Sequence, residues 1–352
     1  MASWPPLHVI GITHRKADLG LRERFARSPE DIAALLSGDG AADRTGVVLS
    51  TCNRFEVYWW GEADWAEWFL TLADRSGPPI PRAAVVRQRA LPAVRHLFGV
   101  AAGLDSQVLG ETEILGQVRR AWGLSRDLGA TSRELDLIFA AAIAAGRRVR
   151  RETALGRHPA SVGSVAVQEA SAECKGLAGR MVVVVGAGEA ARAVAAALLA
   201  AGARTHAVSR HVDRALALAR SYPVVVEPWD QLDRLIAEAD VMIAATSAPH
   251  AFLSTDRLQA AGGGRDQPLV LIDLGVPRNV DADARSLPGM KILDLDDLRN
   301  RGSGRLLELN PGLDAARLIL ERELVRLLVK LERWSAPVTE PGEPRARADS
   351  AG

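Results

Sequence analysis

The chain has 352 residues, of which 48% are hydrophobic, and 44 Lys and Arg nearly balance 43 Asp and Glu. This length predicts two or three domains with a sizeable core, and the small net charge neither favours nor excludes a nucleic-acid partner. No apolar run approaches the roughly 18 residues that span a bilayer. Residues 1–6 lack the basic start and apolar stretch of an export signal. We therefore expect a soluble, cytoplasmic protein without membrane contact.

The chain has only two cysteines, Cys52 and Cys174. This count excludes a disulfide framework and a metal site of the multiple-cysteine kind. We expect no metal site, and a cysteine in a polar setting stays available as a thiolate nucleophile.

The first part of the chain mixes strand and helix patterns. Residues 7–13 predict a strand and residues 21–27 a helix, and a second helix begins at 28–30, with Ser28 as N-cap and Pro29 in the first turn. An aromatic helix follows near residues 65–69. This mixture predicts an α+β domain.

Cys52 lies in a polar cluster, residues 50–56, between the apolar residues 47–49 and 57–59. We interpret the whole segment as one buried strand that the cluster interrupts. Burying such groups without partners would cost about 1–3 kcal/mol each, so the cluster is expected to line a site. The alternative is a core cysteine, because free cysteine is among the most buried residue types.

Residues 91–151 have a helical pattern, with His96 just beside the apolar stripe. A histidine in this position is either structural or catalytic, and the pattern alone favours the structural role. Residues 103–117 make a poor amphipathic helix, because glycines and polar side chains are grouped there. They look arranged for a ligand, although a helix cap would also explain Asp105 and Ser106.

A basic run occupies residues 147–151. It could contact phosphates. The alternative is a solvated helix face, which is the more common role of such a run. The second interpretation is favoured.

A second domain begins near residues 181–185, whose composition predicts a buried parallel strand. A glycine-rich turn and an alanine-rich helix to Leu199 follow directly. This strand–turn–helix context predicts a Rossmann-type domain that binds the pyrophosphate of a dinucleotide at the helix N-terminus. The predicted cofactor-binding residues of the turn are Gly186, Ala187, Gly188, Glu189, Ala190 and Ala191.

The end of the next strand, Ser209 and Arg210, selects the cofactor. An NAD enzyme usually has an acid here, whereas Ser and Arg can bind a 2′-phosphate. NADPH is therefore the predicted cofactor. The later strands, 241–245 and 269–274, end in small or polar residues, as expected beside a nicotinamide.

The chain is expected to end with a glycine-rich link at residues 302–304, a long helix over 313–331 and a disordered tail from 337. The predicted fold is α/β and multidomain. It has a catalytic and substrate-binding domain (1–157), a Rossmann-type NADP-binding domain (158–300), a linking helix (301–336) and a tail (337–352).

Several segments jointly resemble the glutamyl-tRNA reductase family over about residues 7–335. The resemblance rests on the glycine-rich turn and on residues 11–14, 21–23, 50–54, 96–98, 103–106, 109–111, 114–117 and 272–278. It implies an NADPH enzyme that converts glutamyl-tRNA(Glu) to glutamate-1-semialdehyde, the first step of tetrapyrrole synthesis from glutamate.

The resemblance also implies roles for individual residues. Cys52 would attack the glutamyl ester to form a thioester, and Arg54 would pair with the carboxylate of the substrate side chain. His96 would either polarise the carbonyl or assist proton transfer, and Arg54 or protonated His96 could lower the pKa of the thiol. The other implied substrate-binding residues are Thr51, Asn53, Ser106, Glu111, Thr112, Glu113 and Gln117.

The chain departs from the family pattern in three ways. Lys16 stands where a threonine is usual and Glu113 where a glutamine is frequent. In addition, we expect the helical dimerisation domain of the family to be largely missing after the long helix. We expect weak or absent dimerisation: either a dimer forms through residues 313–333 alone or the protein is monomeric. A further alternative is that the long helix packs on the body of its own chain. The aminomutase that consumes the product is a further expected partner.

Two other functions compete with this interpretation. One is a shikimate-dehydrogenase-like NADP oxidoreductase, which would have no use for the cluster around Cys52. The other is a non-catalytic, truncated relative that binds tRNA or a pathway partner. The intact Cys52, Arg54, His96 and glycine-rich turn favour the enzyme.

Overall fold

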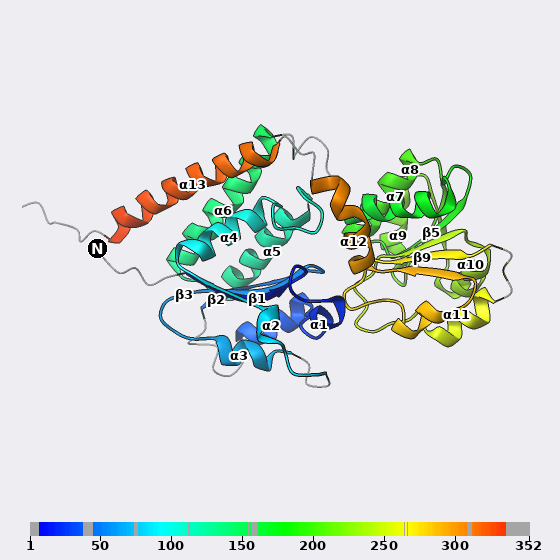
Figure 1. The fold of residues 1–352 in the computed structure, drawn as a ribbon, viewed down its shortest axis with the longest axis horizontal. Coiled ribbons are helices and arrows are strands. Elements are labelled where there is room, and N and C mark those ends of the chain that lie inside the picture. The colour runs from blue at the N-terminus through cyan, green and yellow to red at the C-terminus, as the bar shows by residue number, and fades with distance from the viewer. Residues whose placement is uncertain are drawn as a thin grey trace, which may run out of the picture.

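The computed structural model describes residues 7–37, 45–73, 77–111, 113–153, 155, 161–263, 265, 267–307 and 312–335. Two α/β domains lie side by side, and helix α12 (Leu295–Leu307) lies between them (Figure 1). Among the described helices, none is both long and apolar enough to cross a membrane.

The first domain is built on an antiparallel sheet of four strands in the order β2-β3-β1-β4. The pairing of β1 with β3 runs from Leu7 opposite Trp60 to Thr13 opposite Arg54. This register brings the end of β1 beside the start of β3. The strands are β1 (Leu7–Thr13), β2 (Gly46–Ser50), β3 (Arg54–Trp60) and β4 (Val85–Arg89).

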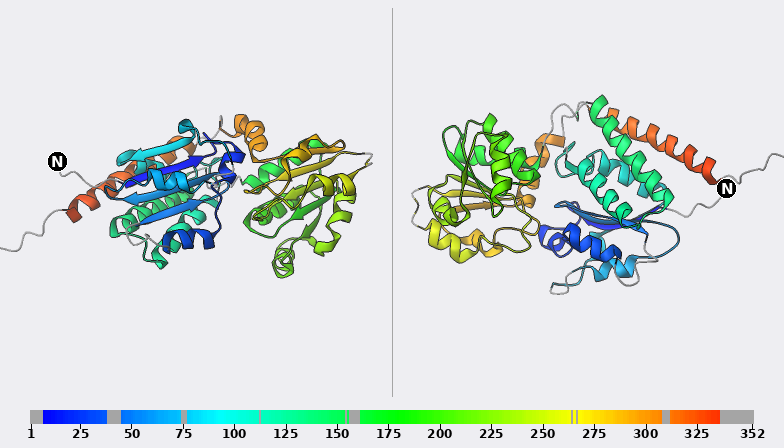
Figure 2. Two further views of the ribbon diagram at one scale, coloured as in Figure 1. Left: turned by 90° about the horizontal axis from the view of Figure 1, so that it is seen from below. Right: turned by 180° about the vertical axis from the view of Figure 1, so that it is seen from behind.

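Helices cover both faces of this sheet, as Figures 1 and 2 show. Alternate side chains of a strand point to opposite faces, so Val9 packs into the core under one helical layer and Ile10 into the core under the other. One layer contains α4 (Leu91–Ala101), α5 (Glu113–Asp127) and α6 (Arg133–Glu152), and the other contains α1 (Leu19–Glu23), α2 (Pro29–Ser37) and α3 (Ala66–Thr71). A short 3-10 turn (Arg82–Ala84) precedes β4.

The second domain contains a parallel sheet of six strands in the order β10-β9-β8-β5-β6-β7. Counted from its first strand, β5, and read from the β7 edge, this order is 3-2-1-4-5-6, which defines the Rossmann fold. The predicted fold is thus confirmed. The strands are β5 (Met181–Val185), β6 (Arg204–Val208), β7 (Val224–Glu227), β8 (Val241–Ala244), β9 (Leu269–Asp273) and β10 (Met290–Leu293).

Two apolar cores lie on the two faces of this sheet. Side chains of α7, α8 and α12 share one core, and those of α10 and α11 share the other. The helices are α7 (Val162–Cys174), α8 (Glu189–Ala200), α9 (Val212–Ala219), α10 (Leu232–Glu238) and α11 (Thr255–Gly262), with 3-10 turns at Trp229–Gln231 and Ala282–Ser286.

The last helix, α13 (Gly312–Ser335), packs on the first domain against α4 and α6. The long helix thus packs on the body of its own chain, as one of the expectations for it stated. The predicted glycine-rich link at residues 302–304 is wrong, because α12 continues through Gly302 and Gly304 to Leu307. The predicted tail, residues 337–352, lies outside the described residues.

The contact between α4 and α6 depends on Gly146, since a Cβ added there would lie 2.5 Å from the carbonyl oxygen of Ala101. We expect Gly146→Ala to lower the free energy of unfolding by about 1–3 kcal/mol through overpacking. The matched control is Gly123→Ala on α5, where an added Cβ meets nothing within 4 Å. This control should stabilise the protein by about 0.5–1 kcal/mol. Urea denaturation measures both, and equal changes would contradict the packing.

Candidate active site

Cys52 lies in the tight turn that joins β2 to β3. The predicted single interrupted strand is wrong, because β2 ends at Ser50 and β3 begins at Arg54. The Thr51 hydroxyl accepts hydrogen bonds from the backbone N–H groups of Asn53 and Arg54, each at 3.2 Å. A threonine side chain that satisfies nearby N–H groups favours a turn over a continuing strand.

The Cys52 turn faces the second domain. Cys52 is half-buried and packs against the apolar cluster that combines Val108 with the core under α7 and α8. On its other side, the carbonyl oxygen of Asn53 accepts a hydrogen bond of 2.8 Å from the backbone N–H of His14. Cys52 therefore lies where the first domain meets the second.

Arg22 holds this turn from α1. One guanidinium nitrogen, Nη1, donates to the carbonyl oxygen of Cys52 at 2.5 Å, and Nη2 forms an ion pair of 2.5 Å with Asp296 on α12. The Arg22 side chain is only 2% exposed. A buried arginine with two such partners fixes the turn relative to α12.

The charges around Cys52 shift the pKa of its thiol in opposite directions. Burial, together with the negative charges of Glu111 and Glu113, raises the pKa of the Cys52 thiol to about 12, and the positive charge of Arg22 acts to lower it. Among the largest influences on the pKa of this thiol, the cation is Arg22; a contribution of Arg54 or His96 to its activation stays a prediction from the sequence.

Arg54 and His96 instead share the buried carboxylate of Glu56. Nη1 of Arg54 lies 3.1 Å from Glu56 Oε1, and His96 Nε2 lies 2.7 Å from the same oxygen. The Tyr58 hydroxyl donates to the other oxygen at 2.7 Å. Arg54 also pairs with Asp105 at 3.0 Å. Each charge in this buried network thus has a partner of opposite sign.

The network sets the protonation of its members. Burial alone would raise the pKa of Glu56, but His96 and Arg54 outweigh it and bring that pKa to about 2. Burial lowers the pKa of His96, but the Glu56 carboxylate outweighs burial and raises it. The two groups therefore favour the charged imidazolium–carboxylate pair. The guanidinium of Arg54 is fully buried, and its Nε has no hydrogen-bond partner among the described residues.

The other predicted substrate-binding residues lie on the loop before α5 and on its first turns. Ser106 and Glu111 are buried, whereas Glu113 and Gln117 are half-buried and one helical turn apart on α5. Burial and the neighbouring Glu111 raise the pKa of Glu113 to about 7. Thr112 lies outside the described residues. The structure thus places an acid that titrates near neutral pH beside the thiol.

The glycine-rich turn fits a bound dinucleotide. Gly186 has φ +121° and lies against the carbonyl oxygen of Ala245, so a side chain would be strained there. An added Cβ on Gly188, the N-cap of α8, meets nothing within 4 Å, which leaves room for a pyrophosphate beside the helix N-terminus. Ala187 and Ala190 are half-buried, and Ala191 is buried.

The 2′-phosphate end of this site contains Ser209 and Arg210. Both residues follow β6, and the guanidinium of Arg210 lies 5.8 Å from the ring centre of Trp229. Ser209 is buried, and its hydroxyl accepts a hydrogen bond of 3.2 Å from the backbone N–H of His211. The cation–π contact supports the exposed arginine at the edge where a 2′-phosphate would lie.

Polar contacts join the two domains around these sites. Glu189, at the start of α8, forms a two-pronged ion pair of 3.0 and 2.8 Å with Arg120 on α5. Glu23 on α1 accepts hydrogen bonds of 2.6 and 2.9 Å from the backbone N–H and the Nε of Arg278. The loop after β9 therefore touches α1, next to the helix residue that holds Cys52.

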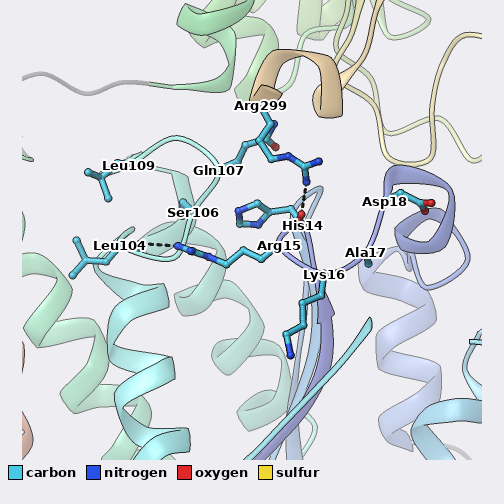
Figure 3. Close-up of a pocket in the computed structure, with 10 residues that line it drawn as sticks. All are labelled: His14, Arg15, Lys16, Ala17, Asp18, Leu104, Ser106, Gln107, Leu109 and Arg299. Atoms are coloured by element: carbon cyan, nitrogen blue, oxygen red, sulfur yellow. Dashed lines mark hydrogen bonds between the residues drawn. The ribbon is translucent and has the colours of Figure 1, made fainter. Parts of the chain in front are cut away.

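An open pocket of about 490 Å³ lies beside the Cys52 turn (Figure 3). It is lined by the loop after β1, the loop before α5 and α12. Its residues are His14, Arg15, Lys16, Ala17, Asp18, Leu104, Ser106, Gln107, Leu109 and Arg299. Only Ser106 among these was predicted as a site residue.

The sequence analysis gave no individual role to Arg22 or to Glu56, which it included only in the polar cluster 50–56, although both lie at the site. The signal for Glu56 was present, because an acid two residues after Arg54 in a strand shares its face. For Arg22 the decisive partner, Asp296, is 274 residues away. The basic run contributes internal contacts: Arg148 pairs with Glu323, and Arg150 donates to the carbonyl oxygen of Glu111.

Comparisons with known proteins match the two domains of this chain to two family models and the chain as a whole to glutamyl-tRNA reductases. The family model "Glutamyl-tRNAGlu reductase, N-terminal domain" matches residues 10–153, and "Shikimate / quinate 5-dehydrogenase" matches residues 168–301. The glutamyl-tRNA reductase of Thermus thermophilus is 40% identical over 84% of this chain and 73% of its own length. That of Deinococcus radiodurans is 38% identical over 82% and 83%. The solved glutamyl-tRNA reductase of Methanopyrus kandleri has a TM-score of 0.50 and 33% identity, over 93% of this chain and 81% of that one.

The fold and the site define a two-domain oxidoreductase in which a cysteine-bearing domain faces a dinucleotide-binding domain. The dinucleotide domain has the strand order and the glycine-rich turn expected of a dinucleotide-binding enzyme. With relatives of this identity and coverage, the chain belongs to the glutamyl-tRNA reductase family.

The charges around Cys52 predict how fast an alkylating reagent modifies it. In the Cys174→Ser background, the alkylation rate should rise steeply with pH, because the thiolate fraction grows about tenfold per pH unit below a pKa and the pKa of this thiol is about 12. Arg22→Ala should slow alkylation at pH 8 by on the order of tenfold, since a pKa shift of one unit changes the thiolate fraction tenfold. Arg22→Lys, which keeps the charge, should restore much of the rate.

Glu113→Gln is the matched variant, for which we expect the alkylation rate to change in the opposite direction. It removes a negative charge that raises the pKa of Cys52, so the rate should increase, and the increase should be larger above pH 7 than below, because Glu113 is ionised above its pKa of about 7. If Arg22 and Glu113 had only a structural role, their two variants would not change the alkylation rate in opposite directions. Equal rates for Arg22→Ala and the parent would contradict the assignment of Arg22.

Proposed function

We propose that this protein is an NADPH-dependent glutamyl-tRNA reductase that works through a thioester on Cys52. The observation that carries this proposal is the position of Cys52, which lies between a polar substrate domain and the core of the dinucleotide-binding domain. The family membership supports the substrate, and the glycine-rich turn with Ser209 and Arg210 supports the cofactor.

The first step is an acyl transfer. The thiolate sulfur of Cys52 attacks the ester carbonyl of glutamyl-tRNA, a carbon–sulfur bond forms, and the ester carbon–oxygen bond breaks. The released 3′-oxygen of the tRNA takes up one proton. Splitting the reaction in this way helps because a thioester is more electrophilic than the ester that it replaces.

The second step is a two-electron reduction of the thioester. NADPH, when bound, supplies a hydride to the carbonyl carbon, and the sulfur leaves as the thiolate of Cys52 while the aldehyde forms. Cys52 packs against the core of the dinucleotide-binding domain, so the thioester would form next to the domain that binds the hydride donor. This position favours its reduction.

Proton transfer to and from the thiol is assigned to the acids beside it. Glu113 has a pKa of about 7 and lies close enough to Cys52 to act on the pKa of the thiol. A base whose pKa lies near the working pH is best suited to take such a proton. His96 is held in its charged form by Glu56, which suits a group that polarises the reacting carbonyl.

Arg54 was expected to bind the side-chain carboxylate of the substrate. Its Nη atoms are already paired with Glu56 and Asp105, so we propose that it acts on the substrate through its remaining Nε. Thr51 and Asn53 shape the turn that presents the thiol. Ser106, Glu111 and Gln117 remain the proposed contacts of the amino and carbonyl groups, and Thr112 remains a sequence prediction.

The proposal separates cleanly from a shikimate-dehydrogenase-like activity. The match to that family covers only residues 168–301, and it gives the Cys52 turn no role. The expected partnership with the aminomutase, the weak or absent dimerisation, the cytoplasmic location and the domain boundaries at 157 and 300 stay predictions from the sequence.

A Cys52→Ser variant tests the covalent step. With glutamate-labelled tRNA and no NADPH, the wild-type protein should retain label on Cys52, and the addition of NADPH should release it as the aldehyde. The serine variant should retain no label and lose reduction by at least about a thousandfold, because it lacks the thiolate nucleophile. Its NADPH binding should be unchanged. Near-normal turnover in this variant would end the thioester proposal.

A second variant tests the choice of cofactor. Arg210→Asp places a negative charge where the 2′-phosphate is proposed to lie, so KM for NADPH should rise by on the order of tenfold or more. KM for NADH should rise far less. Asp213→Asn, on the exposed first turn of α9, serves as a nearby charge control. Equal effects on both cofactors would place the 2′-phosphate elsewhere.

A further inference from the structure

Several residues that line the pocket beside the Cys52 turn have polar atoms that form no hydrogen bond within the described part of the chain. Three of its residues each have one buried atom without a hydrogen-bond partner among the described residues: Nδ1 of His14, Oγ of Ser106 and Oε1 of Gln107. Buried polar atoms in folded proteins are nearly always paired. Three such atoms in residues that line one pocket point to a polar ligand that would pair with them.

The same pocket is lined by three cations and one acid, Asp18; of the cations, Arg15 is paired with Asp105 and Arg299 lies 3.6 Å from Asp296. Arg15, Lys16 and Arg299 line it, and in Figure 3 the imidazole of His14 lies between the guanidinium groups of Arg299 and Arg15. Lys16 extends away from Arg299 toward the opposite edge, and no carboxylate forms an ion pair with it in the described part of the chain. An anionic group is therefore favoured at this edge.

The walls suit a flat ring. Leu104 and Leu109 are half-buried apolar side chains on the pocket surface, and the Arg15 side chain, paired with Asp105 at 2.5 Å, is 56% exposed. Nucleic-acid bases stack on guanidinium planes and apolar side chains in this way. The volume of about 490 Å³ is on the scale of pockets for ligands larger than a single amino acid, about 300–1,000 Å³.

A hydrogen bond connects a residue of the pocket to the turn that carries the reacting thiol. Its residue His14 donates its backbone N–H to Asn53, the neighbour of Cys52. A ligand in the pocket thus lies beside the turn that presents the nucleophile. In an aminoacyl-tRNA, the group next to the reactive ester is the terminal adenosine, whose ribose bears the ester.

We propose that this pocket binds the terminal adenosine of the tRNA acceptor end, with Lys16 contacting the phosphate that joins it to the preceding nucleotide. This inference rests on the proposed function and adds a subsite to it. The unpaired Oε1 of Gln107 can accept a hydrogen bond from the adenine amino group, and Ser106 can bind a ribose hydroxyl.

Binding of uncharged glutamate tRNA, with and without its terminal adenylate, tests the subsite. All titrations contain saturating NADPH, so that the dinucleotide site is filled. The wild-type protein should bind the intact tRNA at least tenfold more tightly than the shortened one. Lys16→Ala should weaken binding of the intact tRNA about fivefold, and its binding should depend less steeply on salt, by about 0.7 in the log–log slope for one lost phosphate contact. It should leave binding of the shortened tRNA unchanged.

The matched control is Lys330→Ala, which removes an equally exposed positive charge from α13. It should bind both tRNAs like the wild-type protein. If Lys16→Ala weakens both tRNAs equally, or if shortening the tRNA costs the wild-type protein nothing, the subsite is wrong.

A measurement of acyl transfer distinguishes failure of the proposed subsite from failure of the proposed function. Transfer of labelled glutamate to Cys52 by a wild-type protein that does not distinguish the two tRNAs would overturn the subsite alone. A protein that distinguishes the two tRNAs but never takes up the label would overturn the proposed reaction and leave the subsite standing.

Discussion

The contact on which the active site most depends is made by one buried arginine. Arg22 joins the carbonyl oxygen of Cys52 to the carboxylate of Asp296, so the nucleophile turn and α12 are fixed by the same guanidinium. Removing the Asp296 carboxylate would leave the buried guanidinium of Arg22 without its counter-charge, which is strongly unfavourable. The same arginine therefore determines both the position of the Cys52 turn and the docking of α12 on the first domain.

This arrangement explains why the thiol is not simply activated by its surroundings. Two acids and burial hold the proton on Cys52, and one cation opposes them. A thiolate that persisted in the free protein would be open to oxidation and to unrelated electrophiles. A thiol that loses its proton only when substrate alters the balance of charges reacts more selectively.

Local signals were sufficient for the dinucleotide domain and insufficient for the thiol site. The turn at Gly186 follows a buried strand and begins a helix, so its sequence determines its geometry without distant partners. The Cys52 turn was mistaken for strand, because apolar residues flank it on both sides and the hairpin depends on the Thr51 hydroxyl. The pairing of Arg54 with Glu56 was accessible from strand alternation, but its closure by His96 and Asp105 required the tertiary fold.

The return of α13 to the first domain has a consequence for motion. The chain leaves the first domain after α6, builds the whole dinucleotide domain, and comes back to pack α13 against that same α6. The dinucleotide domain is thus an insertion with two covalent attachments, not a body on a single tether. Two covalent attachments restrict the movement of one domain relative to the other more than a single connection would, so the dinucleotide domain stays close to the thiol.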